Sequence, residues 1–224
     1  SEIYVIDHKL TTEQAKGHTA GRYGRGGDIL YRYGNPAAYR TGADESLFGG
    51  HRPDQAIFGN HNARWIKPGF PGHGSIMLFN NGIMRRLPAN EDYTYEASRD
   101  AANSLSSVDV VDPHPDATGH YILDDALGHW TPLAPDWSVS FPEKHIYSQS
   151  YGGAQRLKNG NTVMFYPGNT VEGIKFQILE VTPDKRLVWN FTSPWDAHAD
   201  IPIFRGVRYA VDFPGLQGKD LSPK

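Results

Sequence analysis

The chain of 224 residues carries a net charge of −3 and has an isoelectric point near 6.3, which gives no electrostatic basis for binding nucleic acid or an anionic membrane surface. It contains no cysteine, so disulfides, thiolate metal ligands and cysteine nucleophiles are excluded. No run of residues is long and apolar enough to span a bilayer, and the length suffices for one domain with a substantial core.

Glycine and proline, with 24 and 16 copies, interrupt the chain at short intervals, and aromatic residues are plentiful. This composition predicts an all-β fold that is rich in loops. One short helical turn is expected at residues 11–16, where Thr11 or Thr12 can serve as its cap.

Short strand-like segments then recur along the chain in a fixed order. Residues 2–7 form the first of them, and it leads to a segment in which Tyr31 precedes Pro36 by five positions. The same pair of segments returns twice downstream, and each later copy follows a further matched pair of strand-like segments. The two complete sets comprise residues 61–82, 106–112 and 136–142, and residues 152–168, 176–182 and 186–194.

Repeats of four short strands are typical of β-propeller blades. The sequence predicts an all-β β-propeller of four-stranded blades that is incomplete here, with about two and a half blades and a C-terminal closing strand. Within one domain we expect a half blade at 1–36, a blade at 61–142, a blade at 152–194 and a closing tail at 203–224. Because a propeller ring closes with about four to eight blades, we expect the missing blades in an N-terminal part of a longer protein or in a partner chain.

Local patterns add detail to the expected blades. In residues 162–166 both alternating faces are largely apolar, as in a strand buried between two neighbours. The Asn-Gly sequences within 80–82 and 158–160 predict tight turns, where positive φ is accessible. Long insertions such as 112–135 are expected to be loops, which often carry function on a rigid scaffold.

The repeated segments resemble the arylsulfotransferase family of bacterial six-bladed propellers, and the resemblance covers nearly the whole chain. It is carried by GDILYRYGNPAAY (27–39), LFG (47–49), GNHNARWIKPGFPGHGSIMLFNNG (59–82), GGAQRLKNGNTVMF (152–165), FQILEVTPDKRLVWNF (176–191) and FRGVRYAVDFPGLQGKDL (204–221). The resemblance implies transfer of a sulfuryl group from an aryl sulfate to a phenol without phosphoadenosine phosphosulfate or another cofactor. It also implies a periplasmic or extracellular location and N-terminal blades that precede this segment.

The family resemblance also implies which residues act. In the family a histidine near the central channel attacks sulfur, and other histidines and an arginine hold the sulfate oxygens. His61 matches the family's histidine at the start of an innermost strand and is the expected catalytic residue, and Asn62 beside it is an expected substrate-binding residue. Arg85 or Arg86 matches the arginine that follows the Asn-Gly turn and is the expected substrate-binding residue.

An internal alignment of the two complete repeats limits this assignment. Matching Ala63 with Ala154 places Gly152 opposite His61, so the second repeat lacks a histidine at that position. His145 is the candidate that substitutes for it in substrate binding, provided that the loop 142–151 bends inward.

Two other classes of function stay open. One is a catalytically inactive propeller that acts as a binding or structural module, because Gly152 lies opposite His61 in the alignment. The other is a metal site on loop histidines and carboxylates, although their spacing matches no known ligand motif and no metal is expected. The candidates for that site are His51, His61 and His73, and His114, His120 and His129 with Asp112, Asp116, Asp124 and Asp125.

Overall fold

The computed structural model describes residues 1–39, 41, 54–83, 105–141, 146–168, 176–194 and 204–222. Regular structure in these residues is β, apart from helix α1 (Thr12–Lys16) and short 3-10 turns at Pro36–Tyr39 and Pro214–Leu216. The strands are β1 (Ile3–Ile6), β2 (Ile29–Tyr33), β3 (Asn60–Trp65), β4 (Ile76–Asn80), β5 (Ser107–Val111), β6 (Leu123–Asp124), β7 (His129–Trp130), β8 (Trp137–Val139), β9 (Gly153–Arg156), β10 (Thr162–Tyr166), β11 (Gln177–Val181) and β12 (Leu187–Thr192).

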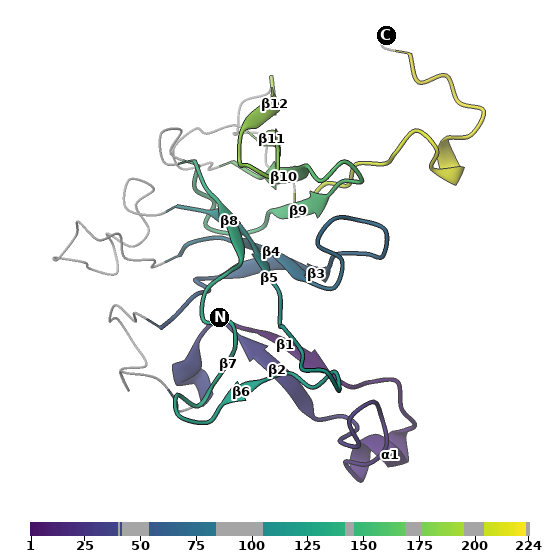
Figure 1. Ribbon diagram of the computed structural model, residues 1–224. Coiled ribbons are helices and arrows are strands. Elements are labelled where there is room, and N and C mark those ends of the chain that lie inside the picture. Colours follow the sequence, from purple (N-terminus) through teal and green to yellow (C-terminus); the bar gives the residue numbers. More distant parts are fainter. Residues whose placement is uncertain are drawn as a thin grey trace, which may run out of the picture.

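The strands form two four-stranded and two two-stranded antiparallel sheets (Figure 1). Their orders are β3-β4-β5-β8, β9-β10-β11-β12, β1-β2 and β6-β7. The all-β prediction is therefore confirmed, and each strand-like segment of the repeats contains a strand. In both four-stranded sheets hydrogen-bonded neighbours follow one another along the chain, with only the β6-β7 hairpin inserted between β5 and β8.

The β3-β4-β5-β8 sheet is buried on both faces. Met77 and Phe79 of β4 join a core that also contains Met164 and Leu179 of the β9-β12 sheet. The alternate residues of β4 lie on the opposite face and join a core with strands β1 and β2, formed by Ile3, Tyr31, Tyr33, Ile57, Ile76, Leu78 and Val111. The three sheets are therefore stacked face to face, and period-two alternation gives β4 one apolar row for each neighbour.

Strand β10 has the same property, because all five of its residues are buried. The prediction of two apolar faces for residues 162–166 is confirmed. Met164 and Tyr166 face the β3-β4-β5-β8 sheet. On the opposite face, the ring of Phe165 lies against Gly206 of the C-terminal segment, where an added Cβ would come within 2.2 Å of the ring.

The expected helical turn is confirmed and its cap is Thr11. The Thr11 hydroxyl accepts from the backbone N–H of Gln14, and the Gln14 side chain accepts from the backbone N–H of Thr11. This reciprocal capping box satisfies donors that a five-residue helix would otherwise leave unpaired.

The insertion between β5 and β8 differs from the predicted loop, since it contains the β6-β7 hairpin. The indole N–H of Trp130 donates to the carbonyl of Leu30 in β2 at 3.2 Å, and Tyr121 packs on Tyr31. Aromatic side chains at the hairpin thus supply the apolar contacts that fold this segment back onto the β1-β2 sheet.

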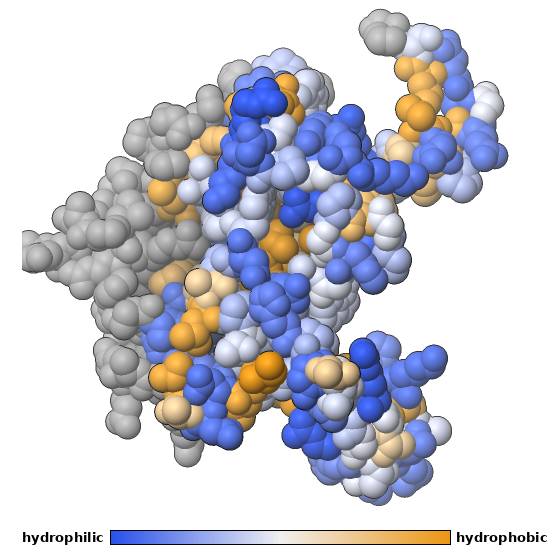
Figure 2. Space-filling model, viewed as in Figure 1, coloured by the Kyte–Doolittle hydropathy of each residue, from blue (hydrophilic) through white to orange (hydrophobic). Residues whose placement is uncertain are grey.

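The predicted C-terminal closing strand is wrong for the described residues 204–222, which contain no strand. The segment runs beside β9, but the Gln155 side chain takes the place of a backbone ladder there. Its amide donates to the carbonyl of Arg208 and accepts from the Arg208 N–H, each at 2.9 Å. These two bonds occupy the backbone N–H and carbonyl of Arg208, which strand pairing would need. The segment then extends away from the sheets and carries exposed apolar side chains (Figures 1 and 2).

The two Asn-Gly sequences have different roles. Residues 158–160 form the predicted tight turn between β9 and β10, with Gly160 at φ +88°. At residues 80–82 the predicted positive φ is present at Gly82, at +76°, but the tight turn is not, because Asn80 ends β4 and the N–H of Ile83 donates to the carbonyl of Phe58. Asn80 and Asn81 are instead fully buried, and their side chains bond to several other segments. No helix within the described residues has the length and apolar character required to cross a membrane.

Burial of Tyr31 makes the fold sensitive to alkaline pH. Its hydroxyl has no hydrogen-bond partner among the described residues, and burial, reinforced by the charge of Asp136, raises the pKa of Tyr31 well above its ordinary value. Only the unfolded chain then loses this proton above about pH 10, so stability falls by about 1.4 kcal/mol per pH unit above that point. We expect Tyr31→Phe to be at least as stable as the unmodified protein at pH 7 and to lose less stability at pH 11.

Urea unfolding at both pH values measures this difference. Tyr4→Phe is the matched control, because the Tyr4 side chain is 51% exposed in the neighbouring strand. An equal alkaline loss in the Tyr31→Phe and Tyr4→Phe variants would contradict the assignment to Tyr31.

Candidate functional site

His61, the expected catalytic residue, lies half-buried near the start of β3, on the edge of its sheet. It pairs with Phe79 of β4, and its ring faces the beginning of β9. The centroids of the Tyr151 and Phe204 rings both lie 6.0 Å from that of His61. Three segments that are distant in the sequence therefore meet at His61.

Asn81 fixes the orientation and tautomer of the His61 ring. The Asn81 amide nitrogen donates to the carbonyls of Ser148 and Tyr151, each at 2.9 Å. Its amide oxygen therefore faces His61 Nδ1, at 2.7 Å. Since this oxygen can only accept, Nδ1 carries the proton and the lone pair of the neutral ring lies on Nε2.

Nε2 of His61 faces the backbone of Tyr151. The Tyr151 N–H donates to Nε2 at 3.3 Å, a long hydrogen bond. Tyr151 and Gly152 have φ of +66° and +98°, and a Cβ on Gly152 would come within 2.7 Å of the Phe79 ring. Glycine at 152 thus permits the close approach that brings the Tyr151 N–H to His61.

A bulge in β3 separates His61 from the next charged residue. The register shifts between His61 and Arg64, and Asn62 takes a φ of +58°, which asparagine tolerates better than most residues. The Asn62 amide oxygen accepts from the Arg64 guanidinium. The Asn62 amide oxygen is therefore engaged by Arg64 in this structure.

The bulge also revises the alignment of the two repeats. Phe165 in the second sheet is the counterpart of Phe79 in the first. His61 pairs with Phe79, and Gly153 pairs with Phe165. The extra residue in β3 moves the counterpart of His61 from Gly152 to Gly153. In either register the second repeat has glycine where the first has histidine.

Two arginines lie next to this site without a carboxylate partner among the described residues. Burial lowers the pKa of Arg64, and the nearby charge of Arg205 lowers it further. The Arg205 guanidinium lies 5.9 Å from the centroid of the Phe204 ring. Two cations with no acid between them favour a bound anion.

Of the residues expected at the site, the structure brings together His61 and Asn62 only. Arg85, Arg86 and His145 lie outside the described residues. Sequence reasoning missed Asn81, which it assigned to a tight turn, and Arg64. Antiparallel pairing of β3 with β4 sets Asn60 opposite Asn80, and it therefore places Asn81 beside Gly59, close to His61. This pairing was the signal that could have predicted a role for Asn81.

The loop histidines and carboxylates form small clusters of two or three groups. His114 Nε2 lies 3.0 Å from a carboxylate oxygen of Asp136, and His120 Nδ1 lies 2.7 Å from the Thr118 hydroxyl. Within the part of the chain that the structure describes, no group of three or more such side chains is arranged to hold a metal ion. His51 lies outside that part.

Comparison of the chain with protein-family models, with curated proteins and with solved structures gave no match. The arylsulfotransferase resemblance therefore stays a prediction.

The tautomer of His61 leads to a test of the role of Asn81. Replacing Asn81 with Ala leaves the carbonyls of Ser148 and Tyr151 without their donor, so we expect a loss of about 1–3 kcal/mol in unfolding free energy. Without the amide acceptor, only the long hydrogen bond from the Tyr151 N–H still favours the Nδ1-protonated tautomer, so we expect the His61 ring to populate both neutral tautomers. Nitrogen chemical shifts of the histidine ring report the tautomer, and urea unfolding reports the stability.

Asn190→Ala serves as the control, because Asn190 is exposed on β12. It should change neither quantity. A purely Nδ1-protonated His61 ring in Asn81→Ala would disprove the orienting role of Asn81.

Proposed function

We propose that this protein transfers a sulfuryl group from an aryl sulfate to a phenolic acceptor, with His61 as the nucleophile. The family resemblance suggests this reaction. The observation that best supports it is the Asn81 contact, which leaves the lone pair of the neutral His61 ring on Nε2. A neutral imidazole of fixed tautomer is a suitable nucleophile near neutral pH.

The proposed reaction has two steps at Nε2. In the first, the Nε2 lone pair attacks sulfur, the bond between sulfur and the aryl oxygen breaks, and the phenolate leaves with the electron pair. The imidazole ring then carries a positive charge, which the Asn81 oxygen beside Nδ1–H partly offsets. In the second, an acceptor phenolate attacks sulfur and the N–S bond electrons return to Nε2.

Neighbouring groups have matching roles in this proposal. Arg64 and Arg205 supply positive charge for the sulfuryl oxygens, which suits a planar guanidinium. The rings of Tyr151 and Phe204 offer apolar surface for the aryl group. Before attack, the Nε2 lone pair must leave its 3.3 Å hydrogen bond with the Tyr151 N–H.

The proposed scaffold for this site is a β-propeller in which the stacked sheets are blades. In that arrangement β3 and β9 are innermost strands, so His61 faces the central channel. Two features support it: each four-stranded sheet follows chain order, and the stacked sheets share apolar faces. Closure of the ring then requires further blades from a longer chain or a partner.

A catalytically inactive binding module is the second candidate, and one observation favours it. Both ring nitrogens of His61 have hydrogen-bond partners, Asn81 and the Tyr151 N–H. A histidine satisfied in this way can be purely structural. The protein would then bind an aromatic anion without transferring its sulfuryl group.

Substitution of His61 separates the two candidates. We expect His61→Asn to abolish release of 4-nitrophenol from 4-nitrophenyl sulfate in the presence of phenol, because the nucleophile is lost. In the unmodified protein, rapid quenching should trap one SO3 group on the peptide that contains His61.

His73→Asn is the matched control and should leave turnover unchanged, because His73 is exposed in the loop after β3. Turnover that survives in His61→Asn would eliminate the nucleophile assignment. Binding of the aryl sulfate by the unmodified protein without any turnover would favour the binding module.

A further inference from the structure

A further cationic site lies between the two four-stranded sheets, toward the C-terminal end of β3, and it shares Arg64 with the site around His61. A cavity of about 110 Å³ opens there, and both Arg64 of β3 and Arg156 of β9 line it. Arg64 pairs with Met77 and Arg156 with Thr162, so each arginine extends from its own sheet toward the other. The remaining walls are mostly apolar and include Ile66, Phe70 and Met77.

Neither arginine is neutralised by a carboxylate within the described residues. Arg156 donates through Nη1 to the carbonyl of Gly160 at 2.8 Å, and its guanidinium lies 5.2 Å from the centroid of the Trp137 ring. Arg64 donates to Asn62. The Nε atoms of both arginines are buried and have no hydrogen-bond partner among the residues that the structure describes.

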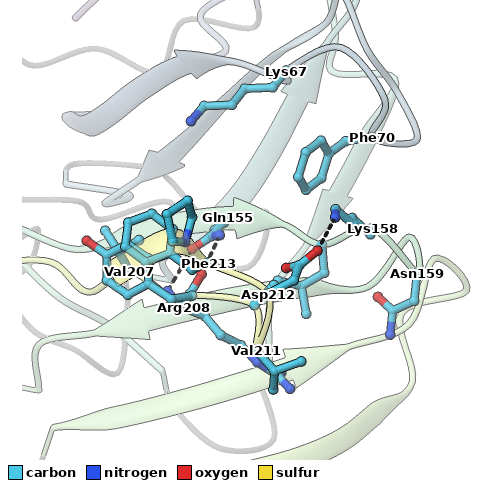
Figure 3. A pocket seen from close by; sticks show the side chains of 14 residues that line it. Lys67, Phe70, Gln155, Lys158, Asn159, Val207, Arg208, Val211, Asp212 and Phe213 are labelled. Atoms are coloured by element: carbon cyan, nitrogen blue, oxygen red, sulfur yellow. Dashed lines mark hydrogen bonds and ion pairs between the residues drawn. The ribbon is translucent and has the colours of Figure 1, made fainter. Parts of the chain in front are cut away.

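Other charged side chains near Arg64 and Arg156 have partners of opposite charge. A groove of about 630 Å³ continues from the cavity along the C-terminal segment, and Lys67, Phe70, Gln155 and Val207 belong to both (Figure 3). In the groove Lys158 pairs with Asp212, and Arg208 pairs with Glu180. Arg64 and Arg156 therefore differ from Lys158 and Arg208, because they have no acidic partner among the described residues.

Two half-buried guanidinium groups that line one small cavity are poorly solvated. Burial lowers the pKa of both, and no nearby carboxylate opposes that change. An oxyanion in the cavity would offset both charges, and guanidinium N–H groups that face the cavity are suitable donors to it.

We propose that Arg64 and Arg156 form a binding site for a tetrahedral oxyanion, such as sulfate or phosphate, between the two sheets. The site shares Arg64 with the proposed chemistry at Nε2 of His61 but differs from it by Arg156, which takes no part in that chemistry. Lys67, which lines both the cavity and the groove, adds a third positive charge at its entrance. The site recognises the oxyanion group itself, which two sources can supply: a free ion, or the charged group of a larger molecule whose apolar part lies in the groove.

Calorimetric titration of the whole chain with sodium sulfate, at constant ionic strength in sodium chloride, tests the proposal. We expect saturable binding, and we expect Arg156→Met to weaken it about tenfold to a hundredfold, as loss of one charged hydrogen-bond donor predicts. Without sulfate, Arg156→Met should melt at a higher temperature than the unmodified protein, because it removes a charge that is buried and not neutralised. Arg156→Lys should retain part of the affinity.

Arg186→Met is the matched control, because Arg186 is exposed in the turn between β11 and β12, and it should bind sulfate normally. Failure of the unmodified protein to bind sulfate saturably would overturn the proposal, whatever the variants do. Equal affinity in the unmodified protein and Arg156→Met would also overturn it. Phenyl sulfate distinguishes the sources: tighter binding than inorganic sulfate indicates a larger aromatic ligand, and equal binding indicates the free ion.

Discussion

Burial of both faces of the β3-β4-β5-β8 sheet is the constraint on which the rest of this structure depends. A sheet covered on two sides must carry two apolar rows on each inner strand, and β4 does so with Met77 and Phe79 on one side and Ile76 and Leu78 on the other. The neighbouring sheets must then lie parallel to it on each side. This stacking leaves β3 and β9 as edge strands close to each other, and their side chains build the site at His61 and the arginine cavity.

Polar groups at the end of β4 convert that stacking into a fixed geometry. Asn80 and Asn81 are fully buried, and burial of an amide is tolerated only when its donors and acceptors are paired. Asn80 bonds to Phe58, Ala56 and Asp109, and Asn81 bonds to His61, Ser148 and Tyr151. The two amides thus tie the segments before β3 and before β9 to one strand end, and the His61 ring is held by the same network.

Charge is distributed unevenly despite the small net charge of −3. Two described cations near the C-terminal segment are paired, Lys158 with Asp212 and Arg208 with Glu180. Arg64 and Arg156 are not, and they lie where two sheets approach each other. Since desolvation penalises an isolated charge much more than a paired one, the arrangement favours an anion in the cavity between β3 and β9. The same logic supports a sulfuryl-binding role beside His61.

The sequence alone determined the strands. Alternation and the fixed order of repeated segments located each strand of both four-stranded sheets, and the capping pattern located α1, because these signals depend on residues close together in the chain. The sequence also identified His61 and Asn62 as neighbours of a candidate site, through family resemblance.

Tertiary structure alone decided that Asn81 is a buried partner of His61 rather than part of a turn, and that Gln155 occupies the backbone groups of Arg208 where a closing strand was expected. It also decided that Arg64 and Arg156, which are 92 positions apart, share one cavity. Such contacts depend on how sheets stack and where a bulge shifts the register, and neither quantity is encoded in local periodicity.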